Sequence, residues 1–582
     1  MTRTSTATDR RIDRDWWKEA VVYQIYPRSF NDSDGDGVGD IPGITAKVDY
    51  LEELGVDVVW LCPVYESPNE DNGYDISDYR AIMDEFGDMA DWERLRDELH
   101  ERDMRLIMDL VVNHTSTDHE WFQRSRREEG DYADYYHWVE GSPDEPPNNW
   151  QSLFGGSAWT YDDEREAWYL HVFNENQPDL NWRNPEVRGA VKSVVSWWLE
   201  QGIDGFRMDA ISHLSKAEGY PDGDPDADGP LGAEHYTFGP RLGEFLDELG
   251  TVIPPDAMTA GEMGGASATD AREFIERGDC LDMVFHFDHL DVDQASDWAD
   301  DDWGEWDLVE FKDLMTRNQR EVAREAWEAL FLGNHDHPRI VSRFGNESHR
   351  RRSAKLVGTF LLTMRGTPYI YQGQELGMTN TEFDALAEID DAMTVGIVDD
   401  LLSEGKIDSF DDVREAVNFR SRDHARTPMQ WTGDEAHAGF TDGDPWLALN
   451  DNHTEVNVAD AVADPDSVWH HYRRLIELRH DDPVLVYGDY ELLAPDHERL
   501  YAYVRSLGDD RRLVVLNWAD EPTTVERADL ADTDGDGSGA DTAVAQALSD
   551  ADPIRLIATD EDSPDDPLGA EFRPFEAVVY EY

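Results

Sequence analysis

The sequence has little lysine, little cysteine and no long hydrophobic segment. Only seven of its 582 residues are lysine, so 43 of the 50 basic residues are arginine. Its two cysteines, Cys62 and Cys280, lie in apolar strand-like segments, which predicts buried thiols rather than a disulfide framework. No stretch reaches the roughly 18 apolar residues that a membrane span requires, and the N-terminus has no apolar signal region. We therefore expect a cytoplasmic protein that does not enter membranes.

Acidic residues are abundant along the whole chain and give it a formal net charge of −78. A surface of this kind repels nucleic acid and anionic membranes. At about 1 M salt the Debye length falls to about 3 Å, which screens the repulsion between the carboxylates. We interpret the charge as adaptation to a high-salt cytosol, with an acidic binding protein as the alternative. The hydrophobic fraction of 40% and the 20 tryptophans predict folded cores rather than disorder.

Eight apolar, β-branched segments alternate with amphipathic helical stretches, such as 44–55, 91–103 and 184–202. The predicted strands are 21–27, 56–63, 105–114, 202–209, 257–263, 281–287, 328–336 and 366–375. This alternation is typical of the α/β class and predicts a (β/α)₈ TIM barrel. A doubly wound sheet is the alternative, but polar residues at the ends of several strands favour the barrel.

Long connections and a change of pattern predict three domains. A small inserted domain is expected at 115–183, after the third strand, and a polar, loop-like excursion at about 376–445. Short alternating strands predict a C-terminal antiparallel β-sandwich at 486–582, with an acidic loop at 531–542. The barrel itself would comprise 1–114 and 184–485.

Four short segments place carboxylates at the ends of predicted strands. They are DLVVNH (109–114), GFRMD (205–209), GEM (261–263) and LGNHD (332–336). Because the carboxyl ends of barrel strands meet at one face, these side chains are expected to converge on a single pocket. The sequence therefore predicts a catalytic site at that face.

Together with four further segments, these motifs resemble glycoside hydrolase family 13, the α-amylase family, over nearly the whole chain. The further segments are AVVYQIYPRSFNDSDGDGVGDIPGI (20–44), NGYDISDY (72–79), QPDLNW (177–182) and SRDHARTPMQW (421–431). The closest similarity is to the branch that holds α-glucosidases and oligo-1,6-glucosidases. The resemblance implies a glycosidase that acts on small oligosaccharides and needs no organic cofactor.

The resemblance also implies catalytic roles. A retaining glycosidase uses two carboxyl groups roughly 5–5.5 Å apart, one as nucleophile and one as acid/base. Asp209 matches the nucleophile, Glu262 the acid/base with a raised pKa, and Asp336 a third carboxylate that holds sugar hydroxyls. Arg207 would keep Asp209 ionised. Asp109 is interpreted as a buried structural carboxylate beneath the site.

Further residues match the family's sugar-binding positions. His114 and His335 resemble the imidazoles that bind the glucose hydroxyls in subsite −1, and Tyr74 resembles the ring stacked on that glucose. Phe173 is expected either to line the pocket or to pack in the core.

Two charged residues are expected to close one end of the pocket, and a third to reach the next subsite. Asp75 resembles the carboxylate that grips the non-reducing glucose, with Arg426 as its partner, and Arg422 is expected to reach subsite +1. A pocket that is closed in this way would make the enzyme exo-acting.

The segment DSDGDGVGD predicts a loop around a divalent cation, Ca²⁺ or Mg²⁺. Its oxygen ligands would come from Asp32, Asp34, Asp36, the carbonyl of Val38, and Asp40. The loop begins like an EF-hand, but its twelfth position is glycine instead of glutamate. A bare acidic turn is the alternative, and it is the preferred interpretation of the similar segment at 532–541.

The residue after the predicted nucleophile is Ala210. In this branch, valine there accompanies α-1,6 cleavage, and alanine or threonine accompanies α-1,4 cleavage. We expect an α-glucosidase that acts on maltose and short α-1,4-glucosides, with transglucosylation as a side reaction. The alternatives are an oligo-1,6-glucosidase, a trehalose synthase-like isomerase and a non-catalytic binding subunit. The sequence leaves open whether the protein is a monomer or a small homo-oligomer.

Overall fold

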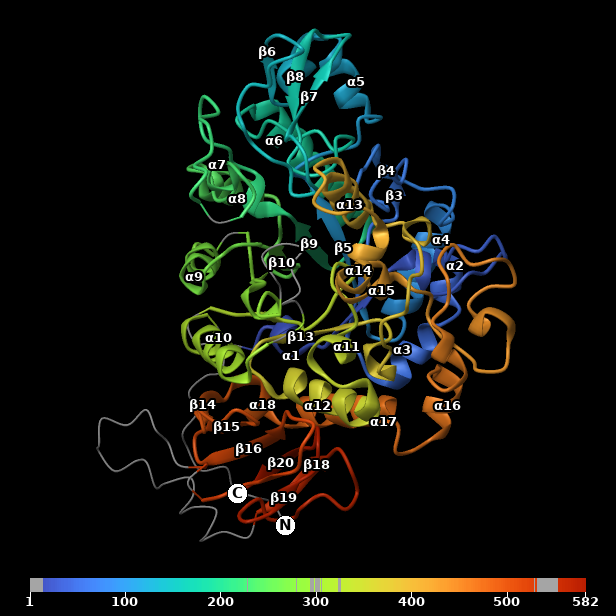
Figure 1. Ribbon diagram of the computed structural model, residues 1–582, viewed down its shortest axis with the longest axis vertical. Coiled ribbons are helices and arrows are strands. Elements are labelled where there is room, and N and C mark those ends of the chain that lie inside the picture. The colour runs from blue at the N-terminus through green and yellow to red at the C-terminus, as the bar shows by residue number, and fades with distance from the viewer. Residues whose placement is uncertain are drawn as a thin grey trace, which may run out of the picture.

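The computed structural model describes residues 14–227, 229–278, 280–293, 298, 304, 306–322, 326–527, 529–530 and 553–582. Its centre is a sheet of eight parallel strands (Figure 1). These are β1 (Val22–Ile25), β2 (Val58–Leu61), β5 (Arg105–Val111), β9 (Gly205–Asp209), β10 (Met258–Glu262), β11 (Met283–Phe285), β12 (Ala329–Leu330) and β13 (Thr367–Tyr371).

The order of the strands confirms the predicted barrel. Hydrogen bonds connect them as β11-β10-β9-β5-β2-β1-β13-β12, and a parallel bridge between Val284 and Glu328 joins the two ends. Every strand lies within one of the eight segments that the apolar pattern predicted. The doubly wound alternative is wrong, because a sheet of that kind would leave both edges open.

Helices surround the barrel and bury the outer faces of the strands. The longest are α4 (Met89–His100), α6 (Pro185–Gln201), α10 (Leu308–Glu321), α12 (Arg350–Thr363) and α17 (Val468–Asp481). Local sequence signals define α6: Asn184 caps its N-terminus, Pro185 occupies the first turn, and Gly202 ends it in a left-handed conformation with φ 94°. Apolar residues at helical spacing on α6 then pack against the sheet.

The segment after β5 carries its own small sheet, which lies above the barrel (Figure 1). Strands β6 (Trp138–Glu140), β8 (Ala167–Leu170) and β7 (Trp159–Asp162) pair antiparallel in that order. Trp150, Trp159 and Trp168 belong to its separate apolar cluster. The boundaries 115 and 183 remain predictions.

The excursion after β13 differs from the loop-like segment that was expected. It contains α13 (Ala392–Ser403) and α14 (Arg414–Arg420). These helices form because they bury a local apolar cluster, which includes Phe383, Ile389, Val398, Leu401 and Val417. The polar composition of this stretch obscured an amphipathic pattern.

The C-terminal part is an antiparallel sheet in the order β14-β15-β16-β20-β18. These strands are β14 (Asp489–Leu493), β15 (Leu500–Leu507), β16 (Asp510–Asn517), β20 (Ala577–Glu581) and β18 (Ile554–Ala558). The short pair β17 (Thr523–Thr524) and β19 (Glu571–Phe572) packs near one face, and within the described residues it is the part of a second layer that is present. Residues 485–487, predicted as strand, belong to helix α18 (Pro483–Tyr487), because Asp482 caps it and Pro483 fits its first turn.

Three smaller predictions concern the thiols, the acidic loop and the membrane. Both cysteines are buried thiols, as expected. The predicted acidic loop at 531–542 lies outside the described residues, and so does the similar segment at 532–541. Within the described ranges, none of the helices combines the length and apolarity needed to span a bilayer.

Candidate active site

A cavity of about 610 Å³ opens at the carboxyl end of the barrel strands. Side chains from the barrel, the inserted segment and the excursion after β13 line it. Eight of the predicted site residues are among them: Tyr74, His114, Phe173, Asp209, Glu262, His335, Asp336 and Arg422. His114, Asp209, Glu262 and Asp336, one from each of the four strand-end segments, therefore share one cavity, as that pattern predicted.

Arg207 lies at the centre of the predicted catalytic group and is 1% exposed. Its Nη1 lies 2.5 Å from Asp109 Oδ1 and 2.7 Å from Asp209 Oδ1. Its Nη2 lies 2.9 Å from Glu262 Oε2. Arg207 and Asp209 are two residues apart on β9, so their side chains point to the same face of the sheet. One guanidinium group therefore contacts three carboxyl groups from three neighbouring strands.

The carboxyl groups around Arg207 outnumber the positive charge that holds them. Burial raises the pKa of Asp209, and Glu262 and Asp109 add to this rise, whereas Arg207 opposes it. Burial also raises the pKa of Asp109 to about 6. Like charges this close oppose one another's ionisation, so the protonation of these carboxyl groups is coupled. A site that must hold one ionised and one protonated carboxyl group needs this property.

Glu262 is also fixed by the backbone of the residue that follows Asp209. The N–H of Ala210 donates a hydrogen bond to Glu262 Oε2 at 2.9 Å. Ala210 has φ 47° and ψ 31°, a left-handed conformation that is uncommon outside glycine. This turn directs the amide of Ala210 toward the end of β10. The backbone that directly follows the predicted nucleophile is thus hydrogen-bonded to the predicted acid/base.

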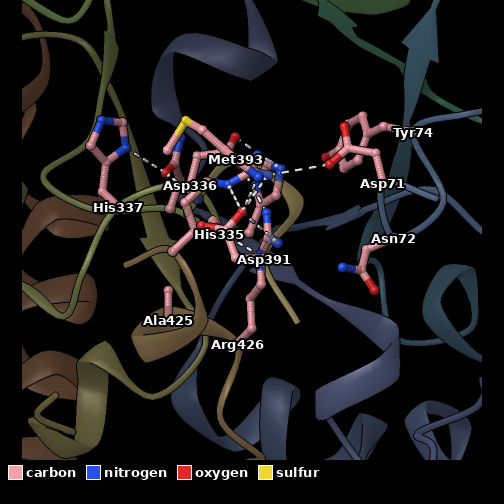
Figure 2. Close-up of polar contacts among 12 residues, drawn as sticks. Asp71, Asn72, Tyr74, His335, Asp336, His337, Asp391, Met393, Ala425 and Arg426 are labelled. Atoms are coloured by element: carbon pink, nitrogen blue, oxygen red, sulfur yellow. Dashed lines mark hydrogen bonds and ion pairs between the residues drawn. The ribbon is translucent and has the colours of Figure 1, made fainter. Parts of the chain in front are cut away.

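Asp336 lies among cationic side chains (Figure 2). Its Oδ1 accepts hydrogen bonds of 3.2 Å from Arg422 and from Arg426, and His335 Nε2 lies 3.1 Å from its Oδ2. Burial opposes ionisation, but His335, Arg422 and Arg426 together hold the pKa of Asp336 well below its usual range. Asp336 is therefore ionised throughout the physiological pH range, unlike the cluster around Arg207.

The prediction that Asp75 grips the sugar and pairs with Arg426 is wrong. Asp75 is fully buried and accepts hydrogen bonds from the Ser67 hydroxyl at 2.9 Å and from the backbone N–H groups of Glu70 and Asp71 at 3.0 and 3.1 Å. These bonds hold the turn before Tyr74. Asp75 is therefore a structural residue of that loop.

Asp71 occupies the position that had been expected for Asp75. It lines the cavity, and its Oδ1 lies 3.3 Å from Arg422 Nη2. Gln177 donates to its other oxygen at 3.0 Å. Both aspartates lie in the segment DNGYD, and the sequence offers no signal for which of them faces the cavity.

The sequence motifs did not identify two further residues that contact Arg422 at the closed end of the cavity. Asp391 is fully buried and accepts a 2.7 Å hydrogen bond from Arg422 Nε. Phe154 lies with its ring 5.0 Å from the Arg422 guanidinium. Both come from segments without a recognised motif, the excursion after β13 and the inserted segment. Arg422 is thus held by contacts from three separate parts of the chain.

Aromatic and imidazole rings form one wall of the cavity. Tyr74 and His335 are stacked with their centroids 5.1 Å apart, and His114 lies 5.1 Å from Phe173. Burial lowers the pKa of His114 to about 4 and that of His335 to about 3. Both imidazoles are neutral at neutral pH, so each offers one donor and one acceptor to a polar ligand.

The acidic loop at 32–40 gathers part of the predicted metal ligand set. Carboxylate oxygens of Asp32, Asp34 and Asp40 lie within 4.8 Å of one another. Asp36 is outside this group, and its carboxylate accepts a hydrogen bond of 2.8 Å from the N–H of Val38. Three hard oxygen donors at this spacing fit a Ca²⁺ or Mg²⁺ ion.

Substitution of Asp71 and of Asp75 should separate binding from stability. We expect Asp71→Asn to lower kcat/KM about 10- to 100-fold, because a charged hydrogen bond to a ligand is lost, with little change in Tm. Asp75→Asn should mainly lower Tm, since its oxygens accept backbone N–H groups. Initial rates and thermal melts of the two variants provide the check. Equal kinetic losses at unchanged Tm would contradict the assignment of Asp71.

Comparison with known proteins gives consistent matches. The family "Alpha amylase, catalytic domain" matches residues 24–488. The chain is 49% identical to an oligo-1,6-glucosidase of Parageobacillus thermoglucosidasius, over 88% of this chain and 92% of the relative. It is 45% identical to an alpha-glucosidase of Pediococcus pentosaceus, over 89% and 94%.

Two solved structures have a similar fold over almost the whole chain. Isomaltulose synthase from Klebsiella sp. LX3 aligns with a TM-score of 0.89 and 40% identity, covering 98% of this chain and 100% of that one. Trehalose-6-phosphate hydrolase of Bacillus licheniformis aligns with a TM-score of 0.89 and 42% identity at the same coverage.

Proposed function

The chain belongs to the α-amylase family of glycoside hydrolases, and we propose that it is a retaining, exo-acting α-glucosidase. Its substrates would be maltose and short α-1,4-glucosides, from which it would release glucose at the non-reducing end. The observation that carries this proposal is the contact of one buried arginine, Arg207, with Asp209 and Glu262 inside a cavity that ends at Asp71 and Arg422.

In the first step, an oxygen of Asp209 attacks the anomeric carbon of the bound glucose. The bond from that carbon to the glycosidic oxygen breaks, and Glu262 transfers its proton to the departing oxygen. Arg207, 2.7 Å from Asp209, favours the ionised form of Asp209 that the attack requires. The product is a covalent β-glucosyl ester on Asp209.

In the second step, Glu262 takes a proton from water, and the water oxygen attacks the anomeric carbon. The ester bond to Asp209 breaks, and glucose leaves with its original configuration. Asp336, ionised and anchored by Arg422 and Arg426, would bind hydroxyls of the ring as it flattens toward the oxocarbenium ion. A sugar hydroxyl in place of water would give transglucosylation.

The closed end of the cavity supports the exo mode of action. Arg422 contacts Asp71, Asp336 and Asp391, and this group of ion pairs would lie beyond the first glucose. A chain that continued in that direction would meet buried ion pairs, which are costly to break. Only the non-reducing end of a short chain fits such a pocket.

The linkage preference can be tested at Ala210. Its side chain lines the cavity next to Asp209 and Glu262. We expect Ala210→Val to shift the ratio of kcat/KM for isomaltose over maltose upward by about 5- to 150-fold, because pockets that differ by methyl-sized groups discriminate by about 1–3 kcal/mol. Ala210→Thr has the same β-branched shape and the same backbone strain. A similar shift with threonine would contradict the rule that valine, and not threonine, favours α-1,6 cleavage.

An oligo-1,6-glucosidase is the second candidate, because several relatives at 45–49% identity carry that name. An isomerase is a third, since isomaltulose synthase has a similar fold. Product analysis in molar NaCl, with maltose, isomaltose, sucrose and trehalose supplied separately, distinguishes them. Glucose released mainly from maltose supports the proposal. Preference for isomaltose favours the second candidate, and rearranged disaccharides favour the third.

We also propose a structural divalent cation at Asp32, Asp34 and Asp40, whose carboxylates fit it. Asp40 caps helix α2 (Ile41–Thr45), and the hydroxyl of Thr441 donates to Asp32, so the ion would connect the start of the barrel to a distant loop. We expect a chelator to lower Tm, and added Ca²⁺ or Mg²⁺ to restore it. In Asp34→Asn the same treatment should have a smaller effect. An unchanged Tm in wild-type protein would argue against the ion.

A further inference from the structure

The active-site cavity has an apolar lining that the proposed mechanism does not use. The polar side chains assigned to the first glucose are Asp71, His114, His335, Asp336 and Arg422. The inserted segment and helix α13 add four apolar side chains to the same cavity: Phe154, Phe173, Met393 and Ile397. These four side chains are therefore available to whatever lies next to that glucose.

Two phenylalanines of the inserted segment extend from the closed end toward the nucleophile. Phe154 lies with its ring 5.0 Å from the guanidinium of Arg422. The ring of Phe173 follows, with its centroid 5.7 Å from that of Phe154 and 5.6 Å from that of His213. His213 belongs to the turn directly after the nucleophile, and the backbone of that turn donates to Glu262. Because Glu262 protonates the departing oxygen, this aromatic pair lies on the side where the leaving group departs.

Helix α13 supplies a second apolar wall. Met393 and Ile397 are four residues apart, so they lie on the same face of the helix, and both line the cavity. Gly396 allows the helix to approach the inserted segment closely, because a Cβ atom there would lie 2.9 Å from the carbonyl oxygen of Phe154. Figure 1 shows α13 below the inserted segment. The two segments that carry the apolar side chains therefore meet beside the cavity.

Polar side chains elsewhere in the lining are already bonded to the protein. Asp293 and Arg343 are both buried and form an ion pair, with Arg343 Nε 2.9 Å from Asp293 Oδ2. His337 Nδ1 lies 2.7 Å from Asn334 Oδ1, and His213 Nδ1 lies 3.2 Å from a backbone carbonyl oxygen. A ligand hydroxyl would have to replace one of these bonds, which gains little free energy.

Ser212 and Arg420 also line the cavity. Ser212 is only 1% exposed. The guanidinium of Arg420 lies over the ring of Trp298, 4.7 Å from its centroid. Next to the first glucose, the described residues thus offer more apolar surface than hydrogen-bonding groups.

We propose that this space is an acceptor site for apolar alcohols, so that the enzyme transfers glucose to alkyl alcohols in preference to polyols. The inference rests on the proposed function, because it uses the glucosyl ester on Asp209. The hydroxyl oxygen of the alcohol attacks the anomeric carbon, its proton passes to Glu262, and the ester bond to Asp209 breaks. The products are an alkyl α-glucoside and the free carboxylate of Asp209. The alkyl chain would be buried against the apolar walls.

The acceptor preference is measured on the full chain in molar NaCl, with maltose as donor and with methanol, ethanol, 1-propanol, 1-butanol or glycerol at equal concentration. The readout is the amount of glucoside formed per glucosyl group hydrolysed. We expect this ratio to rise about fourfold for each methylene that becomes buried. It should be roughly tenfold or more higher for 1-propanol than for glycerol, which has the same carbon chain and two more hydroxyl groups.

A flat series from methanol to 1-butanol, or a preference for glycerol over 1-propanol, would overturn the inference. Glucose release from maltose in the same experiment would then leave the proposed function intact. A folded protein that releases no glucose from maltose would refute the proposed function and this inference together.

Variants of α13 test the apolar wall. Met393→Gln keeps the length of the side chain and adds an amide, so it should lower the ratio for 1-butanol over glycerol about tenfold. Ile397→Thr should lower it in the same direction. Val395→Thr is the matched control, because Val395 packs against the local apolar cluster of the excursion instead of lining the cavity. The ratio does not depend on the amount of active protein, so partial unfolding leaves it readable. A wild-type ratio in both Met393→Gln and Ile397→Thr would overturn the inference.

Discussion

Asp209→Asn is expected to lower kcat for maltose by about 10⁴-fold or more, the order of loss seen when a catalytic nucleophile is removed. Asparagine keeps the shape and the contact with Arg207 but cannot form the glucosyl ester. Tm should change little, because no buried volume is lost. Rates measured with purified, folded protein provide the check, and Asp49→Asn, at a side chain that is 81% exposed, is a matched control.

A second variant at the same position tests the covalent role directly. Asp209→Gly opens space beside the anomeric carbon, and azide can enter it and attack in place of the carboxylate. We expect azide to restore turnover and to give a β-glucosyl azide, the configuration opposite to that of the substrate. Substantial hydrolysis by Asp209→Asn without azide would remove Asp209 from the nucleophile position.

Glu262→Gln is expected to lower kcat/KM for maltose by about 10²- to 10⁴-fold, the usual contribution of a positioned general acid. The loss should depend on the leaving group. An aryl glucoside whose phenol has a low pKa departs without protonation, so its first step should be nearly normal. A burst of phenol followed by slow turnover is expected, because the second step still needs Glu262 as base.

The two variants respond differently to the same substrates. Asp209→Asn should be inactive toward maltose and the aryl glucoside alike, whereas Glu262→Gln should retain its burst with the aryl glucoside. If Glu262→Gln lost equal activity toward both substrates, its role would be structural, through its contacts with Arg207 and the N–H of Ala210.

The barrel and the convergence of the catalytic group were predictable, because both follow from local patterns. Strands buried on both faces require continuous apolar segments, and in a parallel barrel their carboxyl ends share one face. The positions of Asp209 and Glu262 at the ends of β9 and β10, and of Asp336 after β12, were therefore sufficient to place these residues together. Helix α6 was similarly predictable from its Asn-Pro start and glycine end.

Other features were not predictable, because they depend on contacts between distant segments. The choice between Asp71 and Asp75 is decided by the path of one turn, in which Asp75 accepts backbone N–H groups and Asp71 is left facing Arg422. Asp391 reaches Arg422 only because α13 and α14 bury a local apolar cluster that the composition did not reveal.

The sequence by itself thus determined the family, the eight strands and the set of carboxylates at their ends, since each is encoded within a few neighbouring residues. Only the tertiary structure decided which side chains close the cavity and how Arg207 is shared among three carboxyl groups. These arrangements depend on packing between segments hundreds of residues apart, which no local pattern specifies.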